Sequence, residues 1–342
     1  MTKKLFMLIV AFVCAATMAA QNIAVVSPGG QTTLYNTFPE AVEGAEDGSV
    51  VYLPGGVSTT NDITVVDKKL TIFGVSHRAD IDNVDGSTKI EGSLYFVKGA
   101  SGSALMGVYL TGSVYFGKSE YESDTIRNVM LKYCNVGNIF AANNYKTSGL
   151  VVNQCYVRNT MFGQSGYDDI NFDTEVTHCI IGIVEKIYGG LISNNIIINN
   201  RSGYYVYDQT FNVCKYSTIK NNIILFSYDN GMSSNAKNGN NYFDGNMFVD
   251  RDLGENCINL PAGTTIEDIF VNPGPGISTM SDFHFKDAYK QYENQVGIYA
   301  GTGFNDKQLA PVPYIIAKQV DDQTDAQGKL NIRVRVKAGD TE

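Results

Sequence analysis

The fold is decided by a short motif that recurs along the middle of the chain, with apolar residues on both sides of a polar turn. Its clearest copies read Leu191-Ile-Ser-Asn-Asn195-Ile-Ile197, Thr218-Ile-Lys-Asn-Asn222-Ile-Ile224 and Tyr242-Phe-Asp-Gly-Asn246-Met-Phe248. Earlier copies carry cysteine where these carry the second polar residue: Val129-Met-Leu-Lys-Tyr-Cys134-Asn-Val136, Leu150-Val-Val-Asn-Gln-Cys155-Tyr-Val157 and Val176-Thr-His-Cys179-Ile-Ile181. The marked positions are 134, 155, 179, 195, 222 and 246, which gives a repeat of about 22 residues and indicates a solenoid.

A repeat of this length cannot bury its own apolar residues, so each copy must stack on its neighbour. Short β-branched runs bounded by Gly and Asn are typical of strands rather than helices. Parallel strands stacked about 4.8 Å apart would bury one continuous apolar column. Asparagine suits a tight bend between strands, and stacked amides can hydrogen-bond along the column. The sequence therefore predicts an all-β, parallel β-helix in which the six marked positions line up.

The cysteines support this interpretation. Five follow the N-terminal segment, an odd number at wide spacing that does not form a disulfide framework: Cys134, Cys155, Cys179, Cys214 and Cys257. We interpret the cysteines at the marked positions as small buried apolar residues. Disulfides between stacked thiols of neighbouring coils stay an alternative, although their geometry is demanding.

Upstream of the coils the pattern changes to that of an amphipathic helix. Residues 33–47 place one apolar stripe on a helix that ends at Gly48, and the stripe consists of Leu34, Phe38, Ala41, Val42 and Ala45. Strands are expected to follow at 50–53, 70–75 and 94–97. A helix in this place would cover the open end of the apolar column, as terminal repeats must.

Several of these stretches resemble a known family. Leu34-Tyr-Asn-Thr-Phe-Pro-Glu-Ala-Val42, Gly48-Ser-Val-Val-Tyr-Leu-Pro-Gly-Gly56 and Leu70-Thr-Ile-Phe-Gly74 resemble the N-terminal cap of pectin-lyase-like right-handed parallel β-helix proteins. Near the end, Asp268-Ile-Phe-Val-Asn272 and Asp282-Phe-His-Phe-Lys286 resemble the closing coil of secreted β-helix proteins from Bacteroidetes. The resemblance implies a right-handed solenoid with an N-terminal capping helix. It does not fix the function, because the same fold carries lyases, hydrolases, adhesins and inert stalks.

The first residues have the pattern of a secretory signal. Lys3 and Lys4 precede an apolar run, and small residues follow at Ala19 and Ala20. We expect three parts: a signal peptide at 1–20, the β-helix domain with its cap at 21–310, and a C-terminal extension at 311–342. No later run is long and apolar enough for a transmembrane segment. These features predict a secreted protein, in the periplasm or at the cell surface of a Gram-negative bacterium.

The C-terminal extension ends in a strand of its own. Asn331-Ile-Arg-Val-Arg-Val-Lys337 alternates apolar and basic residues, which is typical of a strand with one wet face. This strand could lie along the flank of the solenoid or cover its C-terminal end.

The charge of the chain narrows the classes of partner. The formal net charge is −9, and it becomes −11 once Lys3 and Lys4 leave with the signal peptide. A protein that binds phosphates needs a basic face, so we expect no nucleic-acid partner. A polysaccharide or glycan is the partner class that fits best, and the sequence does not predict an oligomeric state.

Catalysis on this fold would need charged side chains on one face of successive coils. Hydrolases use clustered carboxylates, and lyases use a strong base, commonly with calcium. The densest acidic group is Asp168, Asp169, Asp173 and Glu175, and Arg158 lies one strand earlier. Asp168, Asp169, Asp173 and Arg158 are therefore the catalytic candidates, with calcium the one cofactor considered. A solvated loop is the favoured interpretation, because nothing else completes a constellation and no His or Cys pair has metal-ligand spacing.

Tyrosines suggest a binding role. Arg201, Tyr204, Tyr205, Tyr207 and Asp208 form an aromatic and polar group in one loop between coils. Aromatic faces beside hydrogen-bonding groups suit sugar rings, although tyrosine is also simply common on strand surfaces. The leading hypothesis is an exported carbohydrate-binding or surface-structural β-helix protein without an identifiable catalytic site. The alternatives are a polysaccharide lyase or glycoside hydrolase acting on an extracellular polysaccharide, and an inert structural stalk.

Overall fold

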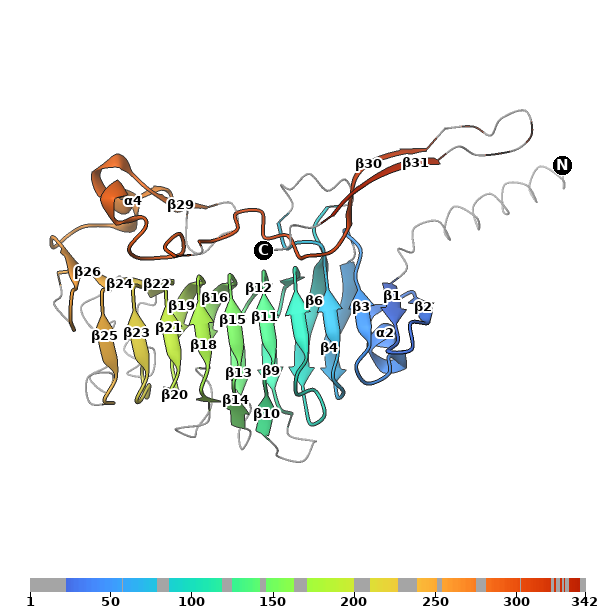
Figure 1. Cartoon of the computed structure of the whole chain (residues 1–342), viewed down its shortest axis with the longest axis horizontal. Helices are drawn as coiled ribbons and strands as arrows, with labels where there is room; N and C mark the ends of the chain where they lie inside the picture. The colour runs from blue at the N-terminus through green and yellow to red at the C-terminus, as the bar shows by residue number, and fades with distance from the viewer. Residues whose placement is uncertain are drawn as a thin grey trace.

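The computed structural model is a right-handed parallel β-helix whose coils stack along the long axis of the molecule (Figure 1). The predicted fold class is confirmed. The structure describes residues 23–56, 58–78, 86–118, 125–141, 146–162, 171–199, 210–226, 239–250, 254–274, 281–301, 303–320 and 332–338, together with 323, 327 and 329. The proposed signal peptide lies outside the described residues.

The front sheet faces the viewer in Figure 1 and carries the front strand of each coil. Its strands in spatial order are β2 (Thr32–Tyr35), β1 (Ile23–Val26), β3 (Val50–Tyr52), β5 (Thr71–Phe73), β7 (Ala104–Met106), β11 (Met130–Lys132), β15 (Val151–Asn153), β18 (Glu175–Thr177), β21 (Leu191–Ser193), β23 (Thr218–Lys220) and β25 (Tyr242–Asp244). The pairings from β3 to β25 are parallel, whereas β1 pairs antiparallel with both β2 and β3. The middle residue of each parallel strand points into the core.

The back sheet lies behind the front sheet and contains β4 (Ser58–Val66), β6 (Lys89–Phe96), β8 (Tyr109–Leu110), β9 (Val114–Phe116), β12 (Asn135–Val136), β13 (Ile139–Ala141), β16 (Tyr156–Met161), β19 (Ile180–Val184), β22 (Ile196–Asn199), β24 (Ile223–Phe226), β26 (Met247–Val249) and β27 (Ile258–Leu260). A short sheet closes the triangle at the bottom of Figure 1 and contains β10 (Thr125–Arg127), β14 (Lys146–Ser148), β17 (Asn171–Phe172) and β20 (Ile187–Tyr188). The chain runs from the short sheet to the front sheet and then to the back sheet in each of these coils.

The six marked residues form one buried column at the bend from the front sheet to the back sheet, which we call the ladder corner. The backbone N–H of each of the first five ladder residues donates to the side chain of the ladder residue in the next coil. The ladder runs in this order: Cys134, Cys155, Cys179, Asn195, Asn222 and Asn246. All six side chains are fully buried. The predicted alignment is confirmed, and so is the predicted ladder of amides. The five described cysteines form no disulfide with one another, so the alternative of disulfides between stacked thiols is wrong for them.

The bend itself falls one residue earlier than the sequence suggested. The left-handed conformation belongs to the residue before each ladder residue, for example His178 (φ 53°), Asn194 (φ 58°) and Asn221 (φ 54°). Asparagine in the ladder is therefore selected for its amide and not for its backbone freedom. The preceding position turns the chain and leaves its side chain outside the core.

The capping helix is shorter than the sequence predicted. Helix α2 covers only Phe38–Gly44, with Thr37 as its N-cap and Pro39 in its first turn. Phe38, Ala41 and Val42 are buried as expected, but Leu34 lies in strand β2 and is 59% exposed. The reason is the proline: Pro39 has no N–H, and in a longer helix its ring would clash with the carbonyl of Tyr35, so the helix begins in the turn that contains Pro39 and the preceding segment extends and pairs with β1.

Residues 261–313 leave the last coil and return along the outside of the solenoid, and we call them the strap (Figure 1). They begin with helix α4 (Ile266–Ile269), continue through the antiparallel pair β28 (Phe270–Asn272) and β29 (Asp282–Phe285), and then form the 3₁₀ helix η1 (Asp287–Tyr292). The stretches expected to form a closing coil therefore pack on the outside of the stack.

The strap follows the ladder corner back towards the first coils. Gly297 N–H donates to the carbonyl of Asn221 at 2.8 Å, and further along the Ala310 N–H donates to the carbonyl of Val75 at 2.9 Å. Between them the His178 ring nitrogen Nε2 lies 3.0 Å from the Ala300 carbonyl. Outward side chains of the left-handed turn residues thus hold the strap in place.

The strap also covers one half of the back sheet. The outward-facing Ile180, Ile196 and Ile223 pack with strap residues Phe270 and Ile298 into a second hydrophobic core. Strands β19, β22 and β24 are therefore apolar on both faces, because one face meets the solenoid core and the other meets the strap.

The C-terminal strand forms a hairpin instead of following the flank or covering the last coil. Strand β31 (Ile332–Lys337) pairs antiparallel with β30 (Tyr314–Val320), and this C-terminal hairpin projects from the end of the strap (Figure 1). At its base, Tyr314 packs with Val75 and Leu309 in a small buried cluster.

Candidate functional site

The structure places two of the four catalytic candidates and leaves Asp168 and Asp169 outside the described residues. Asp173 occupies the bend from the short sheet to the front sheet in a left-handed conformation (φ 51°). Its N–H donates to the carbonyl of Tyr188 in the next coil at 3.0 Å. Asp173 is thus a turn residue at the surface of the solenoid.

Arg158 lies on a different face, the outer face of the back sheet. Its guanidinium donates to Asn135 Oδ1 at 2.5 Å and to the carbonyls of Leu110 and Thr111 at 3.0 and 2.7 Å, and it stacks over the ring of Tyr109. Burial lowers the pKa of Arg158. The guanidinium therefore ties neighbouring coils together, and the structure does not bring it together with Asp173.

The sugar-binding candidates Arg201, Tyr204, Tyr205, Tyr207 and Asp208 lie outside the described residues. Described residues in the neighbouring coils nevertheless carry aromatic side chains that are half-buried or exposed. Phe172 and Tyr188 occupy equivalent positions at the ends of the two short-sheet strands β17 and β20. Tyr216 follows at the same bend in the next coil, and Tyr242 begins β25 one coil later.

We call Phe172, Tyr188, Tyr216 and Tyr242 the aromatic flank. The rings of Phe172 and Tyr188 are 5.5 Å apart at 64°, and those of Tyr188 and Tyr216 are 5.2 Å apart at 61°. Tyr216 is 56% exposed and Tyr242 is 48% exposed. Edge-to-face contact leaves part of each ring face outside the contact, so the flank offers apolar surface to a ligand.

Other aromatic pairs on the solenoid lack this property. Tyr95 and Tyr115 stack nearly parallel on the back sheet, with ring centroids 4.5 Å apart and an angle of 11° between planes. Tyr52 and Phe73 stack in the same way on the front sheet, at 5.7 Å and 18°. The faces of these rings cover each other along the solenoid axis, so the pairs stabilise the stacking of coils and leave less ring surface open to a ligand.

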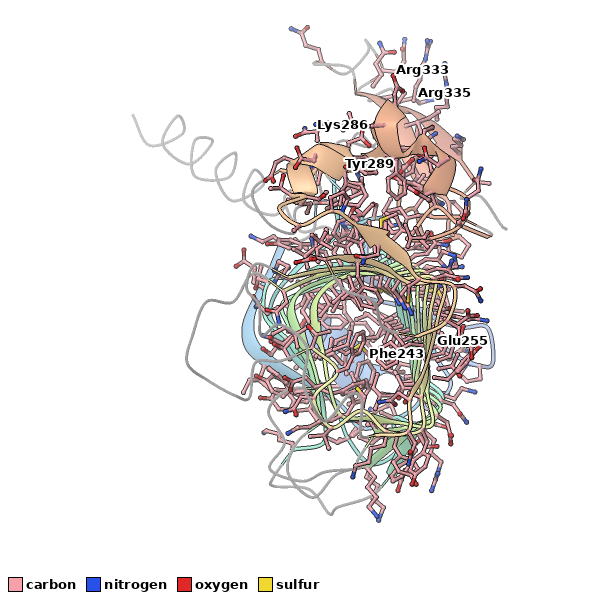
Figure 2. All side chains as sticks on the ribbon, turned by 90° about the vertical axis from the view of Figure 1, so that its left-hand side faces the viewer. Phe243, Glu255, Lys286, Tyr289, Arg333 and Arg335 are labelled. Carbon is pink, nitrogen blue, oxygen red and sulfur yellow. The ribbon has the colours of Figure 1, made fainter. Side chains whose placement is uncertain are left out.

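Polar groups accompany the aromatic flank on the front sheet. The hydroxyl of Tyr242 donates to Glu255 Oε2 at 3.1 Å, and this hydrogen bond raises the pKa of Tyr242. Asn256 Nδ2 donates to Asp244 Oδ1 at 2.8 Å beside it. Glu175 is exposed in the same outward column as Tyr242. Figure 2 shows Glu255 on the outer side of the coils while Phe243, one residue after Tyr242, points into their interior.

A weak signal for this flank is present in the sequence. Phe172 and Tyr188 each stand directly before a residue with positive φ, Asp173 and Gly189. An aromatic residue followed by Asp or Gly therefore marks the bend from the short sheet to the front sheet. The irregular loops before these strands hid the repeat, because their lengths differ from coil to coil.

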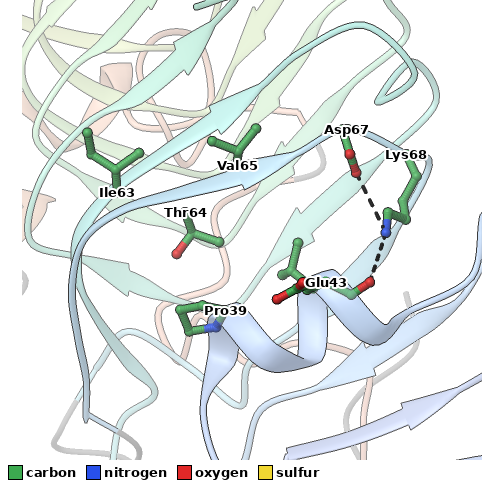
Figure 3. Close-up of a pocket in the computed structure, with 8 residues that line it drawn as sticks. Pro39, Glu43, Ile63, Thr64, Val65, Asp67 and Lys68 are labelled. Carbon is green, nitrogen blue, oxygen red and sulfur yellow. Dashed lines mark hydrogen bonds and ion pairs between the residues drawn. The ribbon is translucent and has the colours of Figure 1, made fainter.

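A groove lies beside the capping helix (Figure 3). It lies between α2 and β4, has a volume of about 220 Å³ and is lined by Pro39, Val42, Glu43, Ile63, Val65 and Lys68, among others. The Lys68 ammonium donates to the carbonyls of Glu43 and Ala45 at the end of the helix and lies 3.6 Å from Asp67. The Lys68 ammonium thus caps the helix and pairs with Asp67, so the cation of this groove already has its partners within the protein.

Among the described residues, no group of three or more His, Cys, Asp or Glu side chains is arranged to hold a metal ion. In the same residues, no helix is both long and apolar enough to cross a bilayer.

No protein-family model, no curated protein sequence and no solved structure matches the chain.

Proposed function

We propose that the chain is an exported carbohydrate-binding protein that presents its aromatic flank to an extracellular polysaccharide. The observation that carries the proposal is the run of edge-to-face rings Phe172, Tyr188 and Tyr216 along one bend, with Tyr216 more than half exposed. Sugar rings pack their C–H faces on such surfaces, and nearby carboxylates and amides accept or donate hydrogen bonds to their hydroxyls.

The geometry of the solenoid suits a chain ligand better than a single sugar. Successive rings of the flank lie 5.5 and 5.2 Å apart because they belong to successive coils. A polysaccharide lying along the axis would meet one ring per coil, and each weak contact would add to the others. Glu175 and Glu255 would then contact its hydroxyl groups from the front sheet.

Binding is tested with the purified protein and a panel of plant and host polysaccharides. The double variant Tyr216→Asn and Tyr242→Thr removes two ring faces while keeping residues that tolerate the left-handed bend and the strand. We expect its apparent affinity to fall about tenfold, which corresponds to about 1.4 kcal/mol. Tyr52→Thr is the matched control, because Tyr52 is exposed on the same sheet but is stacked on Phe73.

Equal losses in the control and the flank variant would contradict the proposed site, as would unchanged binding in the flank variant. The same incubations are assayed for new reducing or unsaturated ends. Release of such ends that Asp173→Asn abolishes would replace the binding function with a lyase or hydrolase. Absence of any retention would leave the inert stalk.

A further inference from the structure

The rings of the aromatic flank are spaced by the rise of the solenoid. Phe172 pairs with Tyr188 of the neighbouring coil and Tyr216 follows in the next, so that their ring centroids lie 5.5 and 5.2 Å apart. These distances are close to the separation of about 4.8 Å between neighbouring strands of a sheet. Tyr242, in register with Thr218, continues the row one coil further and turns it towards the front sheet. A ligand along this row therefore meets one ring in each coil.

This spacing selects the shape of a sugar chain. In a β-1,4-linked chain of glucose or xylose both linkage bonds of each ring are equatorial, so the chain is extended and each sugar advances by nearly the length of its ring. In an α-1,4-linked chain every sugar carries an axial linkage bond, so the chain coils. The rings of the flank cannot follow a coiled ligand, because hydrogen bonds between strands fix the rise from coil to coil. An extended chain keeps one sugar over each ring.

The faces of the sugars are the second criterion. Successive sugars of a β-1,4-linked chain are turned over relative to each other, so a row of rings on one side meets the two faces in alternation. Both faces are apolar only where every hydroxyl is equatorial, as in glucose and xylose. The axial hydroxyl of mannose would press against an aromatic ring in alternate coils and lose its hydrogen bonds to water.

The charge of these coils disfavours an anionic chain. Residues 163–256, loops included, contain eleven Asp or Glu and six Lys or Arg. Beside the flank, Asp173, Glu175 and Glu255 are exposed, and Glu255 accepts the hydroxyl proton of Tyr242. The described lysines of the same coils are half-buried: Lys186, Lys215 and Lys220. A polyuronate would bring a carboxylate on every sugar towards these acidic groups and be repelled, whereas neutral hydroxyls donate hydrogen bonds to them.

We propose that the aromatic flank binds a neutral, extended β-1,4-linked glycan of glucose or xylose, with one sugar over the ring of each coil. The inference rests on the proposed carbohydrate-binding function and narrows it to one class of ligand. The four rings correspond to four consecutive sugars. Tyr216 and Tyr242, at 56% and 48% exposure, offer the largest open ring surface, whereas Phe172 and Tyr188 are half-buried.

The dependence of affinity on chain length is the first test. The purified protein is titrated calorimetrically with cellobiose, cellotriose, cellotetraose and cellohexaose. We expect the affinity to rise about fivefold for each added sugar up to the tetraose, since each sugar meets one more aromatic ring. From the tetraose to the hexaose it should rise less than about twofold, because the row of rings has ended.

Linkage and charge are separated by three further ligands. Maltohexaose is neutral but α-linked, carboxymethyl cellulose is β-linked but anionic, and hexagalacturonate is both α-linked and anionic. We expect each to bind at least about tenfold more weakly than its neutral β-linked counterpart at low ionic strength. Added salt should recover part of the binding of carboxymethyl cellulose and none of the binding of maltohexaose, because salt screens charge and does not change the linkage.

Tyr216→Asn tests the row of rings itself. Asn240 holds the equivalent left-handed turn in the next coil, with φ 54° against 52° for Tyr216, so the change copies a bend that this solenoid already uses. It should lower the affinity for cellotetraose about fivefold. Tyr52→Thr, which removes a ring stacked on Phe73, is the matched control and should leave the affinity unchanged. Thermal unfolding checks that both variants are folded.

Glu175→Gln with Glu255→Gln tests the charge. The readout is the ratio of the affinities for carboxymethyl cellulose and cellohexaose, which should shift about threefold towards the anionic ligand at low salt. A ratio that does not move would overturn the exclusion of anionic chains.

The outcomes distinguish this inference from the proposed function. Equal or tighter binding of maltohexaose or hexagalacturonate, weakened by Tyr216→Asn, would overturn the ligand class and leave carbohydrate binding at the flank in place. Affinity that does not grow with chain length would overturn the match of one sugar per coil. Failure to bind any of these ligands or the panel of polysaccharides would remove the proposed function and this inference with it.

Discussion

The two halves of the ladder corner solve one problem with different chemistry. In the amide half, Asn195, Asn222 and Asn246 accept backbone N–H groups at 2.8 to 3.0 Å. In the thiol half, Cys155 and Cys179 accept equivalent N–H groups with sulfur at 3.5 and 3.3 Å. Both halves also donate to a carbonyl of the preceding coil, as Asn222 does to Ile192 and Cys155 to Leu131.

The difference is the number of protons. An amide has two N–H groups, so Asn195 and Asn222 can also donate to the amide of the next coil, at 2.9 and 3.0 Å. A thiol has one proton and is a weak donor and acceptor. The amide half is therefore a continuous hydrogen-bonded chain, and the thiol half is a stack of small groups that chiefly fill space. The bend therefore requires a small side chain that accepts the backbone N–H, and an amide in that place adds a hydrogen bond between neighbouring coils.

The largest effect is expected from Asn222→Ala. The change leaves the Asn195 N–H without its acceptor in a buried corner, removes the amide that donates to the Ile192 carbonyl and interrupts the amide chain. We expect the free energy of unfolding to fall by about 4 kcal/mol in urea denaturation. Asn153→Ala on the outer face of the front sheet is the control and should lose less than about 1 kcal/mol.

Cys155→Ala should have a smaller effect than Asn222→Ala. Its thiol makes weak hydrogen bonds, so the loss is mainly that of contacts around one small buried atom, about 2 kcal/mol. The same denaturation series measures it. Equal losses in the free energy of unfolding for Cys155→Ala and Asn222→Ala would show that the thiol half and the amide half stabilise the coils equally, contrary to this expectation.

Alkaline pH should weaken the protein through its buried thiols, while the amides do not titrate. Burial raises the pKa of Cys134 and Cys155 well above its ordinary value and raises the pKa of Cys214 to about 12. Below the ordinary thiol pKa both folded and unfolded chains keep these protons, and stability is intact. Above it only the unfolded chain loses them, so stability falls by up to about 1.4 kcal/mol per pH unit for each thiol.

The urea midpoint measured at rising pH checks this expectation. The decline should begin near the ordinary thiol pKa of about 8.5 and continue towards the pKa of the folded state. Cys214→Ala should make the slope shallower by the share of one thiol. A midpoint that does not fall across this range would show that the thiols ionise without unfolding.

The smallest change is expected from Cys179→Asn, which extends the amide half by one coil. The new amide would accept from the Cys155 N–H, donate to the Val152 carbonyl and donate to Asn195. We expect the free energy of unfolding to stay within about 1 kcal/mol of the original value. Cys134→Asn sharpens the test, because its neighbour Cys155 offers only sulfur, and it should be tolerated less well.

The coil stack could be predicted from the sequence because its cause is local and repeated. One apolar residue per strand and one small polar residue per bend recur often enough to fix both the class of fold and the ladder column. The helix is shorter than the periodicity indicates, because the apolar spacing joins Leu34 to Phe38 while Pro39 cannot sit in the interior of a longer helix.

The strap could not be predicted, because its contacts with the coils join residues 76 to 235 positions apart. A clue was present in Ile196-Ile197-Ile198 and Ile223-Ile224-Leu225, runs that are apolar on both faces and therefore need a cover on each. The residues of the aromatic flank could not be predicted from the sequence. The aromatic flank depends on which side chains end the short-sheet strands, and variable loops before those strands obscure the register.

The strap has a consequence for how the protein folds during its synthesis. A solenoid whose coils touch only their neighbours can form from its first coil onward while the ribosome is still adding later ones. Here the cover for Val75 arrives with Ala310, 235 residues later in the chain. The earliest coils therefore wait for the strap, and a nascent chain that stalls before the strap would expose Ile180, Ile196 and Ile223 of the back sheet to chaperones and to other unfinished chains.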